Sequence, residues 1–438
     1  MYDEIRAFDA LIARLREQFP SLIDLSTGRV ERLLEQLGRP QDRMGPVVHV
    51  AGTNGKGSTC AFLRAIGEAA GLRVHVLTSP HLVRFAERIR IAGTLVSEPE
   101  LRELIDQVIA VNAGQEISFN EILTVIAFEA FGRQPADLCV IEVGLGGRFD
   151  SSNVFPAPAV SVITPVDYDH LEMLGPELTK IAWEKAGIIK AGRPAIVARQ
   201  RPEAAQVIEA EAEALRAPVW MMGREIDAWE ERGRLVVQTP DRLLDLPAPS
   251  LGGRHQAENA GLAVAAAVRF AGARIDDQAM AGIANAVWPA RFQRLTTGPM
   301  GAPAKALGAE LWLDGAHNPH GALALAETAQ RMAARDPRPL TLIVAMYGRK
   351  DPQGFFQAVA PLGARIITTT FESATAMTPE ALAAAAVEVG LQAEPAEDVQ
   401  AALDLALAAK GPAPRIIICG GLHFAGEVLA LSPETWPT

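Results

Sequence analysis

Residues 47–59 have the sequence VVHVAGTNGKGST, and this stretch decides the fold of the N-terminal part of the chain. An apolar run typical of a buried strand ends at a glycine-rich turn, and a helical pattern follows at once. Glycines let backbone N–H groups converge on an anion, and the start of the helix adds partial positive charge. We therefore predict a turn that binds the phosphates of a nucleoside triphosphate, with Lys56 at the outer phosphates. The predicted nucleotide-binding residues of the turn are Gly52, Thr53, Asn54, Gly55, Lys56, Gly57 and Ser58.

The turn departs from a Walker A motif, which has Gly five residues before the Gly-Lys pair and Ser or Thr directly after the Lys. Val50 and Gly57 occupy these positions, and Ser58 comes one place late. The departure disfavours ordinary kinases and GTPases. A purely structural turn is the alternative, but a lysine between two glycines at a helix start has little structural purpose.

Composition and charge limit the classes of function. Hydrophobic residues make up 49% of the 438-residue chain, which predicts large cores in two or three domains. The net charge of −11 argues against general binding of nucleic acid. We expect no membrane partner, because no apolar stretch reaches the roughly 20 residues that cross a bilayer and the N-terminus lacks a signal-peptide pattern. Cys60, Cys139 and Cys419 lie far apart, so we expect buried thiols in a reducing cytoplasm.

Short apolar runs alternate with helical patterns in the first part of the chain. This alternation predicts an α/β fold, with a P-loop-type, mostly parallel sheet flanked by helices in an ATP-binding domain of residues 1–296. Residues 218–240 predict a hairpin at the edge of this sheet. The predicted strands are 47–50, 73–78, 138–143, 159–164 and 194–198, and the predicted helices are 99–111, 121–131, 177–187, 257–272 and 276–287.

Residues 297–309 are rich in Gly, Pro and Ala and have no periodicity, so we interpret them as a linker. The alternation restarts after them and predicts a smaller, open, Rossmann-like α/β domain over residues 310–438. Its predicted strands are 310–314, 341–346, 365–370 and 415–419.

Polar residues follow the ends of the predicted strands, where open α/β sheets bind ligands. Glu142 lies in an apolar strand, and a buried carboxylate needs a cation, hydrogen-bond donors or a proton. Mg²⁺ beside a triphosphate would satisfy it, and a buried ion pair is the alternative. Ser79 can give a hydroxyl to a metal ion or cap a turn. His170 follows two acids at a strand end, and Arg148 can hold an anionic substrate.

The second part of the chain follows the same logic. Asp314 ends a predicted strand and can accept hydrogen bonds from ribose hydroxyls, while His317 can face phosphate. Asn259 and Arg291 precede the predicted linker and can bridge the two domains over a nucleotide. For each of these residues a helix cap or a surface ion pair is the alternative. On the residues alone, Lys185 is a helix lysine better suited to an ion pair.

Six segments together resemble the folylpolyglutamate synthase and dihydrofolate synthase family, within the Mur-ligase-like group of ATP-dependent amide ligases. They occur in matching order between about Gly28 and Arg415, which makes the resemblance specific. The segments are Gly52–Ser58, Ser79–Phe85, Glu142–Arg148, Asp169–His170, Glu184–Ile188 and Asp314–Pro319.

The resemblance implies ATP and Mg²⁺, with two magnesium ions, and it admits a monovalent cation. It implies Ser79, Glu142 and His170 as magnesium ligands, and it places Lys185 at the position that carries a carbamate in this family. Addition of CO₂ turns this cation into an oxygen ligand. It also implies that Asn259, Arg291 and Asp314 contact adenosine and phosphate, and that the catalytic residues are Lys56, Lys185 and His317.

The resemblance also implies a pterin-bearing substrate. The segment 118–124 departs from the family pattern, because Asn120 stands where an aromatic residue is expected. The implied substrate-binding residues are Gly28, Arg29, Phe119, Glu121, Thr124 and Arg148.

The implied reaction follows from the chemistry of carboxylates. A carboxylate is a poor acyl donor because its leaving group would be oxide, so transfer of the γ-phosphoryl group first makes an acyl phosphate. The resemblance implies a monomeric enzyme that joins L-glutamate to dihydropteroate or to a (poly)glutamyl folate and releases ADP and phosphate. We expect the second domain to supply the glutamate site and to close over ATP, which keeps water from the acyl phosphate.

Two other functions are weighed against this one. A Mur-type ligase would add an amino acid to a peptidoglycan precursor, but such enzymes usually carry a separate N-terminal domain, and only about 46 residues precede the first predicted strand. A nucleotide-binding protein without ligase activity is the other alternative. It has no need of the metal-site set Glu142, His170 and Lys185.

Overall fold

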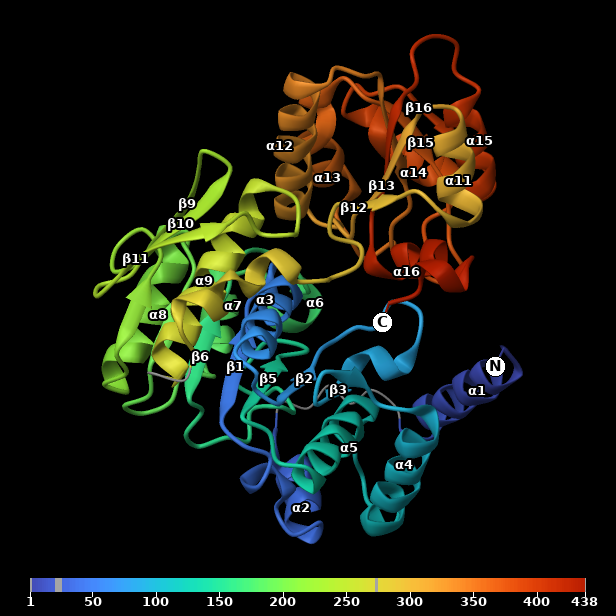
Figure 1. The fold of residues 1–438 in the computed structure, drawn as a ribbon. Coiled ribbons are helices and arrows are strands. Elements are labelled where there is room, and N and C mark those ends of the chain that lie inside the picture. The colour runs from blue at the N-terminus through green and yellow to red at the C-terminus, as the bar shows by residue number, and fades with distance from the viewer. Residues whose placement is uncertain (1, 20–25, 272–274, 438) are drawn as a thin grey trace. The chain divides into compact units, whose positions relative to one another are not determined.

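The structure is a computed structural model, and it describes residues 2–19, 26–271 and 275–437 (Figure 1). The chain forms two compact units. The first runs to Ser250 and includes Gln256–Val287, and the second consists of Leu251–His255 and Trp288–Pro437. The division therefore falls before the predicted boundary at residue 296. Its position follows from β12 (Gln293–Leu295), which pairs with a strand of the second unit.

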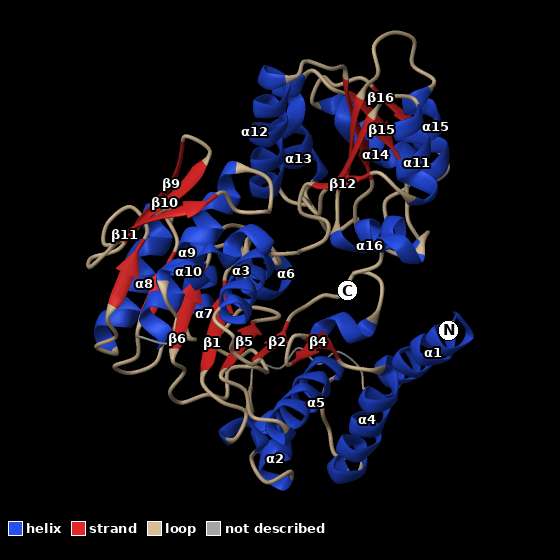
Figure 2. Ribbon diagram, in the orientation of Figure 1, coloured by secondary structure: helices blue, strands red, loops and turns tan. Residues whose placement is uncertain are grey.

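Strand β1 (Val47–Ala51) lies inside a sheet that has eight strands in the described part of the first unit, in the order β4-β3-β2-β5-β1-β6-β7-β8 (Figure 2). The strands from β2 to β8 in this order are parallel, while β3 and β4 pair antiparallel at one edge. The other strands are β2 (Val74–Leu77), β3 (Ile89–Ile91), β4 (Thr94–Leu95), β5 (Leu138–Glu142), β6 (Val160–Ile163), β7 (Ala195–Val197) and β8 (Val219–Met221).

Helices cover both faces of this sheet, which is why the central strands are continuous apolar runs. Helix α3 contacts β1, β2 and β5, while α5 packs with Cys139 and Ile141 of β5. Helices α7 and α8 pack together over β6 and β7. The helices of the unit are α1 (Tyr2–Gln18), α2 (Gly28–Gln36), α3 (Lys56–Ala69), α4 (Glu98–Asn112), α5 (Phe119–Arg133), α6 (Leu171–Leu174), α7 (Leu178–Ala186), α8 (Pro202–Ala214), α9 (Arg254–Ala271) and α10 (Asp277–Met280).

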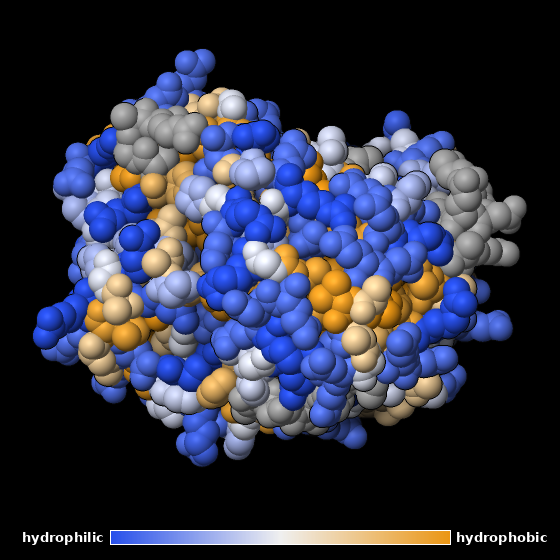
Figure 3. All heavy atoms as spheres, turned by 90° about the horizontal axis from the view of Figure 1, so that it is seen from below, coloured by the Kyte–Doolittle hydropathy of each residue, from blue (hydrophilic) through white to orange (hydrophobic). Residues whose placement is uncertain are grey.

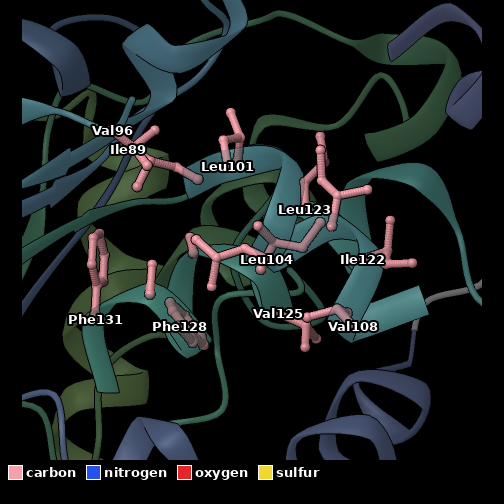
Figure 4. Packing of buried hydrophobic residues seen from close by; sticks show 14 of the residues in the cluster. Ile89, Val96, Leu101, Leu104, Val108, Ile122, Leu123, Val125, Phe128 and Phe131 are labelled. Carbon is pink, nitrogen blue, oxygen red and sulfur yellow. The ribbon is translucent and has the colours of Figure 1, made fainter. Parts of the chain in front are cut away.

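A large apolar core joins α2, α4, α5 and the strands β3 and β5 (Figure 4). Helix α5 is apolar on almost every side and buried, as expected for a helix inside a core. Leu104 and Val108 of α4 face Ile122, Val125 and Phe128 of α5, and all five are fully buried. Each such side chain contributes about 1.5–3 kcal/mol through burial.

Of two predictions for residues 218–287, one is confirmed in part and one is wrong. The expected hairpin is present, because β9 (Asp227–Glu231) and β10 (Arg234–Gln238) pair antiparallel. It does not extend the main sheet: with β11 (Leu243–Pro247) it forms a separate sheet of three strands among the described residues, while β8 extends the main sheet. The expected helix 276–287 is the short α10 followed by a 3-10 turn, Ala281–Asn285. Gly282 lies so close to α3 that a Cβ would be 2.5 Å from the carbonyl oxygen of Ala65, so packing overrides helical periodicity there.

The second unit has a sheet of six strands within its described residues, in the order β12-β13-β17-β14-β15-β16. All neighbours are parallel except β12 and β13. Its elements after β12 are β13 (Glu310–Leu313), α12 (Pro319–Arg335), β14 (Leu340–Val344), α13 (Pro352–Val359), β15 (Arg365–Thr368), α14 (Pro379–Glu388), β16 (Ala393–Pro395), α15 (Val399–Leu407), β17 (Arg415–Cys419) and α16 (Leu422–Ala430).

The predicted linker 297–309 is wrong, because α11 (Gly298–Ala306) occupies most of it. Pro299 lies in the first turn, where the missing N–H is not needed, and the alanines favour a helix. Gly298 has φ of 69°, which suits the bend before the helix. Glycine and proline therefore begin a helix here rather than marking a flexible segment.

The surface is mainly hydrophilic on the face seen in Figure 3, and hydrophobic side chains form separate patches there. None of the helices in the described residues has both the length and the apolar character to span a membrane. Cys60, Cys139 and Cys419 all lie in the described residues and are buried free thiols, as predicted.

The core of α4 and α5 predicts a large cost for shortening Phe128. Phe128→Ala should lower the free energy of unfolding by about 3–5 kcal/mol, because it leaves a cavity in close-packed surroundings. Leu243, which is 68% exposed, is the matched control. Leu243→Ala should change the free energy of unfolding by less than about 0.5 kcal/mol. Urea unfolding followed by circular dichroism measures both, and equal midpoints for the two variants would contradict this core assignment.

Candidate active site

The glycine-rich turn between β1 and α3 is shaped for an anion. Gly52 and Gly55 have φ of 147° and 90°, and α3 begins at Lys56. A side chain at Gly52 would place its Cβ 1.8 Å from Thr164 Oγ1, and one at Gly55 would place it 2.5 Å from Asn259 Oδ1. Both glycines are therefore required by backbone conformation and by space.

Neighbouring elements hold the turn in place. The N–H of Thr53 donates to the carbonyl oxygen of Pro165 at 2.9 Å, and Thr53 Oγ1 donates to the carbonyl oxygen of Asp167 at 2.9 Å. On the other side, Asn259 Nδ2 donates to Gln256 Oε1, whose own amide nitrogen donates to Ser58 Oγ at 3.2 Å. The structure thus brings Asn259 of α9 against the predicted phosphate turn.

Two lysines converge on this turn. Lys56 Nζ donates to the carbonyl oxygens of Gly52 and Thr53 at 3.1 and 3.4 Å. Lys185 Nζ, from α7, donates to the same carbonyl oxygen of Gly52 at 3.0 Å. Burial, together with the positive charge of Lys56, lowers the pKa of Lys185 to about 7. A lysine distant in sequence is therefore held at the turn in a readily deprotonated state.

The predicted metal ligands Ser79 and Glu142 meet at the ends of β2 and β5. Glu142 is 6% exposed, and its Oε2 accepts a hydrogen bond from the N–H of Ser79 at 3.2 Å. Parallel pairing of β5 with β1 sets Glu142 opposite Val50, two residues before the turn. Hydroxyl and carboxylate oxygens are hard ligands of the kind Mg²⁺ takes.

His170 lies at the other flank of the turn, before α6. It has φ of 52°, and its Nε2 is 4.0 Å from Asp169 Oδ2. Within the described residues, three or more His, Cys, Asp or Glu side chains do not gather into a group that could hold a metal ion. The residues present fit Mg²⁺ only as partial ligands, which suits an ion that keeps waters and binds substrate phosphates.

The loop from Gly144 to Asp150 lies over α7. A Cβ at Gly147 would be 2.7 Å from the carbonyl oxygen of Glu184 and 3.0 Å from Lys185 Cα, so only glycine allows this approach. The Arg148 guanidinium donates to Glu211 and stacks 3.8 Å from the ring centroid of Trp183. Arg148, predicted to bind substrate, is thus paired within the protein.

The other predicted substrate residues form two contacts. Arg29 of α2 and Glu121 of α5 form a salt bridge, with Arg29 Nη2 and Glu121 Oε1 2.9 Å apart. Thr124 Oγ1 lies 2.6 Å from the hydroxyl of Ser151. Phe119 begins α5 and is buried, and Gly28 begins α2, with its N–H bound to the Ser26 hydroxyl.

Two partly buried carboxylates, which were not predicted as site residues, organise the loops of the site. Glu87 accepts from the N–H groups of Leu82, Val83 and Arg84. Asp150 accepts from the N–H groups of Gly144, Leu145 and Ser152 and from the Ser152 hydroxyl. Burial raises the pKa of both carboxyl groups, and these donors oppose the shift. The sequence feature that could have predicted both residues is an acid close to a glycine- or proline-containing turn.

In the second unit, Asp314 directly follows β13, and its two oxygens accept from the N–H groups of Phe292 and Ala316 at 2.9 Å each. Arg291 is next to it, since a Cβ at Gly315 would lie 2.8 Å from Arg291 Nη1. His317 Nδ1 is 2.9 Å from the carbonyl oxygen of Gly315. The structure thus brings the predicted residues Arg291, Asp314 and His317 to one turn.

His255, which was not predicted as a site residue, joins the group around Asp314. Burial lowers the pKa of its imidazole, the Asp314 carboxylate raises it, and the Arg291 charge lowers it. Gly253 leaves room for this ring, because a Cβ there would be 2.6 Å from His255 Cε1.

Comparison with known proteins gives consistent matches over most of the chain. Residues 50–267 match the Mur ligase middle domain family, and residues 302–431 match the dihydrofolate synthetase C-terminal domain family. A dihydrofolate synthase/folylpolyglutamate synthase of Mycobacterium tuberculosis is 37% identical, with 88% of this chain and 82% of the relative covered.

Two solved structures are similar along nearly their whole length. Escherichia coli FolC in complex with DHPP and ADP has a TM-score of 0.85 and 29% identity, with 96% of each chain covered. A bifunctional folylpolyglutamate synthase/dihydrofolate synthase with Mn, AMPPNP and L-glutamate bound has a TM-score of 0.83 and 30% identity, with 97% of each chain covered.

The geometry of the turn predicts a specific defect for Gly55→Ala. The substitution should weaken binding of ADP at least about tenfold, because the left-handed backbone costs roughly 1–2 kcal/mol and the new Cβ displaces Asn259. Gly71, which has φ of 72° and open space around it, is the control. Gly71→Ala carries the same backbone strain but should leave ADP affinity unchanged in calorimetric titration. Equal losses in both variants would show that the contact with Asn259 is irrelevant.

Proposed function

Because the chain belongs to the dihydrofolate synthase/folylpolyglutamate synthase family, we propose that it uses ATP to join L-glutamate to the carboxylate of dihydropteroate, of a folate, or of both. The observation that carries the proposal is the phosphate turn, where Gly52 and Gly55 leave the backbone open before α3 and Lys56 stands at the first position of that helix. The N–H groups at the helix start and the charge of Lys56 suit a triphosphate in an otherwise acidic chain.

Residues Gly52 to Ser58 hold the triphosphate of ATP in this proposal. The N–H groups at the start of α3 point at the phosphates, and the Lys56 side chain leaves the carbonyl oxygens of Gly52 and Thr53 to contact them. Asn259 contacts the nucleotide from α9. We assign Arg291, Asp314 and His317 of the second unit to the adenosine and phosphate groups, on the basis of the family resemblance.

Ser79 and Glu142, together with His170, would hold Mg²⁺. Bound there, the ion would neutralise charge that develops on the phosphoryl oxygens during transfer. A second ion and a monovalent cation are further proposals that rest on the resemblance alone. The buried carboxylate of Glu142 and its contact with Ser79 support the first ion, because carboxylate and hydroxyl oxygens of this kind are the ligands that Mg²⁺ takes.

Lys185 is proposed to carry a carbamate. Its unprotonated amine would attack the carbon of CO₂, and loss of one proton would leave a carboxylate on nitrogen. Only the unprotonated amine reacts, and burial, which lowers the pKa of Lys185 to about 7, favours that form near neutral pH. The product would replace a cation at the turn with two oxygen ligands.

The pterin-bearing substrate is assigned to α2 and the start of α5. Arg29, Glu121 and Thr124 offer a paired cation, a carboxylate and a hydroxyl there, and Phe119 offers an apolar ring. Arg148 is a weaker candidate, because Glu211 already pairs with its guanidinium.

The proposed reaction begins when the substrate carboxylate attacks the γ-phosphorus and ADP leaves. The resulting acyl phosphate is attacked by the amine of L-glutamate, and phosphate leaves as the amide forms. Lys56 stabilises the negative charge on the transferred group. We infer that the first unit is the ATP-binding domain and the second the glutamate-ligase domain. We also infer a monomer that works in a reducing cytoplasm, to which the three buried free thiols are suited.

Product formation tests the proposed function directly. Incubation with ATP, Mg²⁺, L-glutamate and either dihydropteroate or a reduced folate should release phosphate and give a product heavier by one glutamyl group in mass spectrometry. Lys56→Ala should lower kcat by about a hundredfold or more, because it removes charge stabilisation of the transferred group. Lys180, an exposed lysine paired with Glu177, is the control, and Lys180→Ala should retain activity. Absence of product with both acceptors from the wild-type protein would refute the proposal.

The carbamate has its own test. Protein equilibrated with ¹³C-bicarbonate should show a carbamate carbon resonance in NMR spectra, and Lys185→Arg should abolish that resonance because guanidinium does not add CO₂. The same variant should lose most of its activity, since it keeps a cation where an oxygen ligand is required. A wild-type spectrum without the resonance, under conditions where the enzyme is active, would exclude the carbamate while leaving the ligase assignment intact.

A further inference from the structure

A buried hydrogen-bonded chain connects the central strand to the loop over Lys185. His49, on β1, is fully buried, and its Nε2 lies 2.9 Å from the hydroxyl oxygen of Ser152. The Ser152 hydroxyl in turn donates to Asp150 Oδ1, and the N–H of Ser152 donates to the same oxygen. Ser152 is 1% exposed, so the bond between His49 and Ser152 is shielded from solvent, while Asp150 is partly buried.

The donors around Asp150 determine the direction of every bond in this chain. Asp150 Oδ2 accepts from the N–H groups of Gly144 and Leu145 at 3.1 and 2.9 Å, while Oδ1 accepts from Ser152 twice. Four donors thus occupy the carboxylate, which leaves no position for a proton on it. Since the single hydroxyl proton of Ser152 is committed to Asp150, its oxygen must accept from His49. The imidazole is therefore the Nε2–H tautomer.

The second ring nitrogen of His49, Nδ1, is also consistent with this tautomer. His49 Nδ1 is buried and has no hydrogen-bond partner among the described residues, and an unprotonated nitrogen leaves no buried donor unsatisfied. Burial lowers the pKa of His49 to about 3, and the charge of Lys190 acts in the same direction. The ring is thus neutral at any pH near 7, so its contribution is the hydrogen bond that Nε2–H donates to Ser152 and not a charge.

The end of the chain is next to the proposed metal and phosphate groups. Asp150 holds Gly144, whose position is such that a Cβ would lie 3.6 Å from Ser79 Oγ. The same loop passes over Lys185 at Gly147, where a Cβ would lie 3.0 Å from Lys185 Cα. Whatever holds this loop therefore sets the surroundings of Ser79 and Lys185.

We propose that His49, Ser152 and Asp150 are positioning residues, which use a directed chain of hydrogen bonds to hold the loop 144–150 against the magnesium-binding end of the site. The role toward magnesium rests on the proposed function, while the proton order does not. The alternative is that these bonds only satisfy polar groups in the core. The two differ in whether breaking the chain changes the response to Mg²⁺.

The proton order is tested by NMR of protein labelled with ¹⁵N at its histidines. The His49 ring, identified by its loss in His49→Gln, should show a protonated Nε2 and an unprotonated Nδ1, unchanged between pH 6 and 8 within the accuracy of the shifts. A protonated Nδ1, or a ring that titrates in this range, would overturn the proposed chain. This readout needs no activity, so it stands even if the reaction is not the one proposed.

The positioning role is tested with two matched pairs of variants. His49→Gln keeps an N–H donor at a similar reach, and His49→Phe removes it while filling the ring volume. Ser152→Thr keeps the hydroxyl, and Ser152→Ala removes it. We expect His49→Phe and Ser152→Ala to raise the Mg²⁺ concentration for half-maximal activity about tenfold, and the hydroxyl- and amide-keeping variants to stay within about twofold of wild type. The KM for L-glutamate should not change in any of them.

Folding is checked by circular dichroism and urea unfolding for each variant. If Ser152→Ala or His49→Phe fails to fold, the folded member of the other pair supplies the comparison. An unchanged Mg²⁺ requirement in folded Ser152→Ala or His49→Phe would overturn the positioning role. A rise equal to that in Ser152→Thr or His49→Gln would overturn it as well, because the hydrogen bonds would then not be responsible.

Discussion

The carbonyl oxygen of Gly52 accepts hydrogen bonds from both Lys56 and Lys185, and the surroundings of the phosphate turn depend on this shared acceptor. One oxygen brings two like charges together, and their repulsion adds to burial in lowering the pKa of Lys185. Loss of the Lys185 proton relieves this repulsion and leaves Lys56 as the cation of the turn. The position of one lysine thus favours the uncharged form of another lysine from a different helix, and that is the form that the proposed carbamate requires.

Carboxylates that bind backbone N–H groups hold the loops around this point. Glu87 fixes the residues after Ser79, and Asp150 fixes the residues after Glu142, so each loop has an anchor of its own. A carboxylate that receives three or four donors makes a rigid turn out of a segment without regular structure. The first unit thus combines a sheet with loops whose shape is set by partly buried carboxylates.

Much of this architecture could be predicted from the sequence, and the family resemblance is confirmed by the comparisons. The parallel strands were found because both faces of the sheet are covered, so β1 and β5 are apolar except for one polar residue each, His49 and Glu142. Lys185 was placed at the site only through the resemblance, since nothing in its helix predicts a contact with Gly52. His49 and Asp150 were not predicted, because their roles depend on partners that only the folded chain brings together. The helix α11 was missed because proline and glycine occur equally at helix starts and in linkers.

The three thiols described above have a further consequence. Burial raises the pKa of Cys60, Cys139 and Cys419, so each stays in the unreactive thiol form while its surroundings are intact. Cys60 and Cys139 lie in the first unit and Cys419 in the second. Alkylation of each sulfur therefore requires local opening of the unit that contains it. The rate of alkylation at each native cysteine therefore reports how often its unit opens locally, and no cysteine has to be introduced for the measurement.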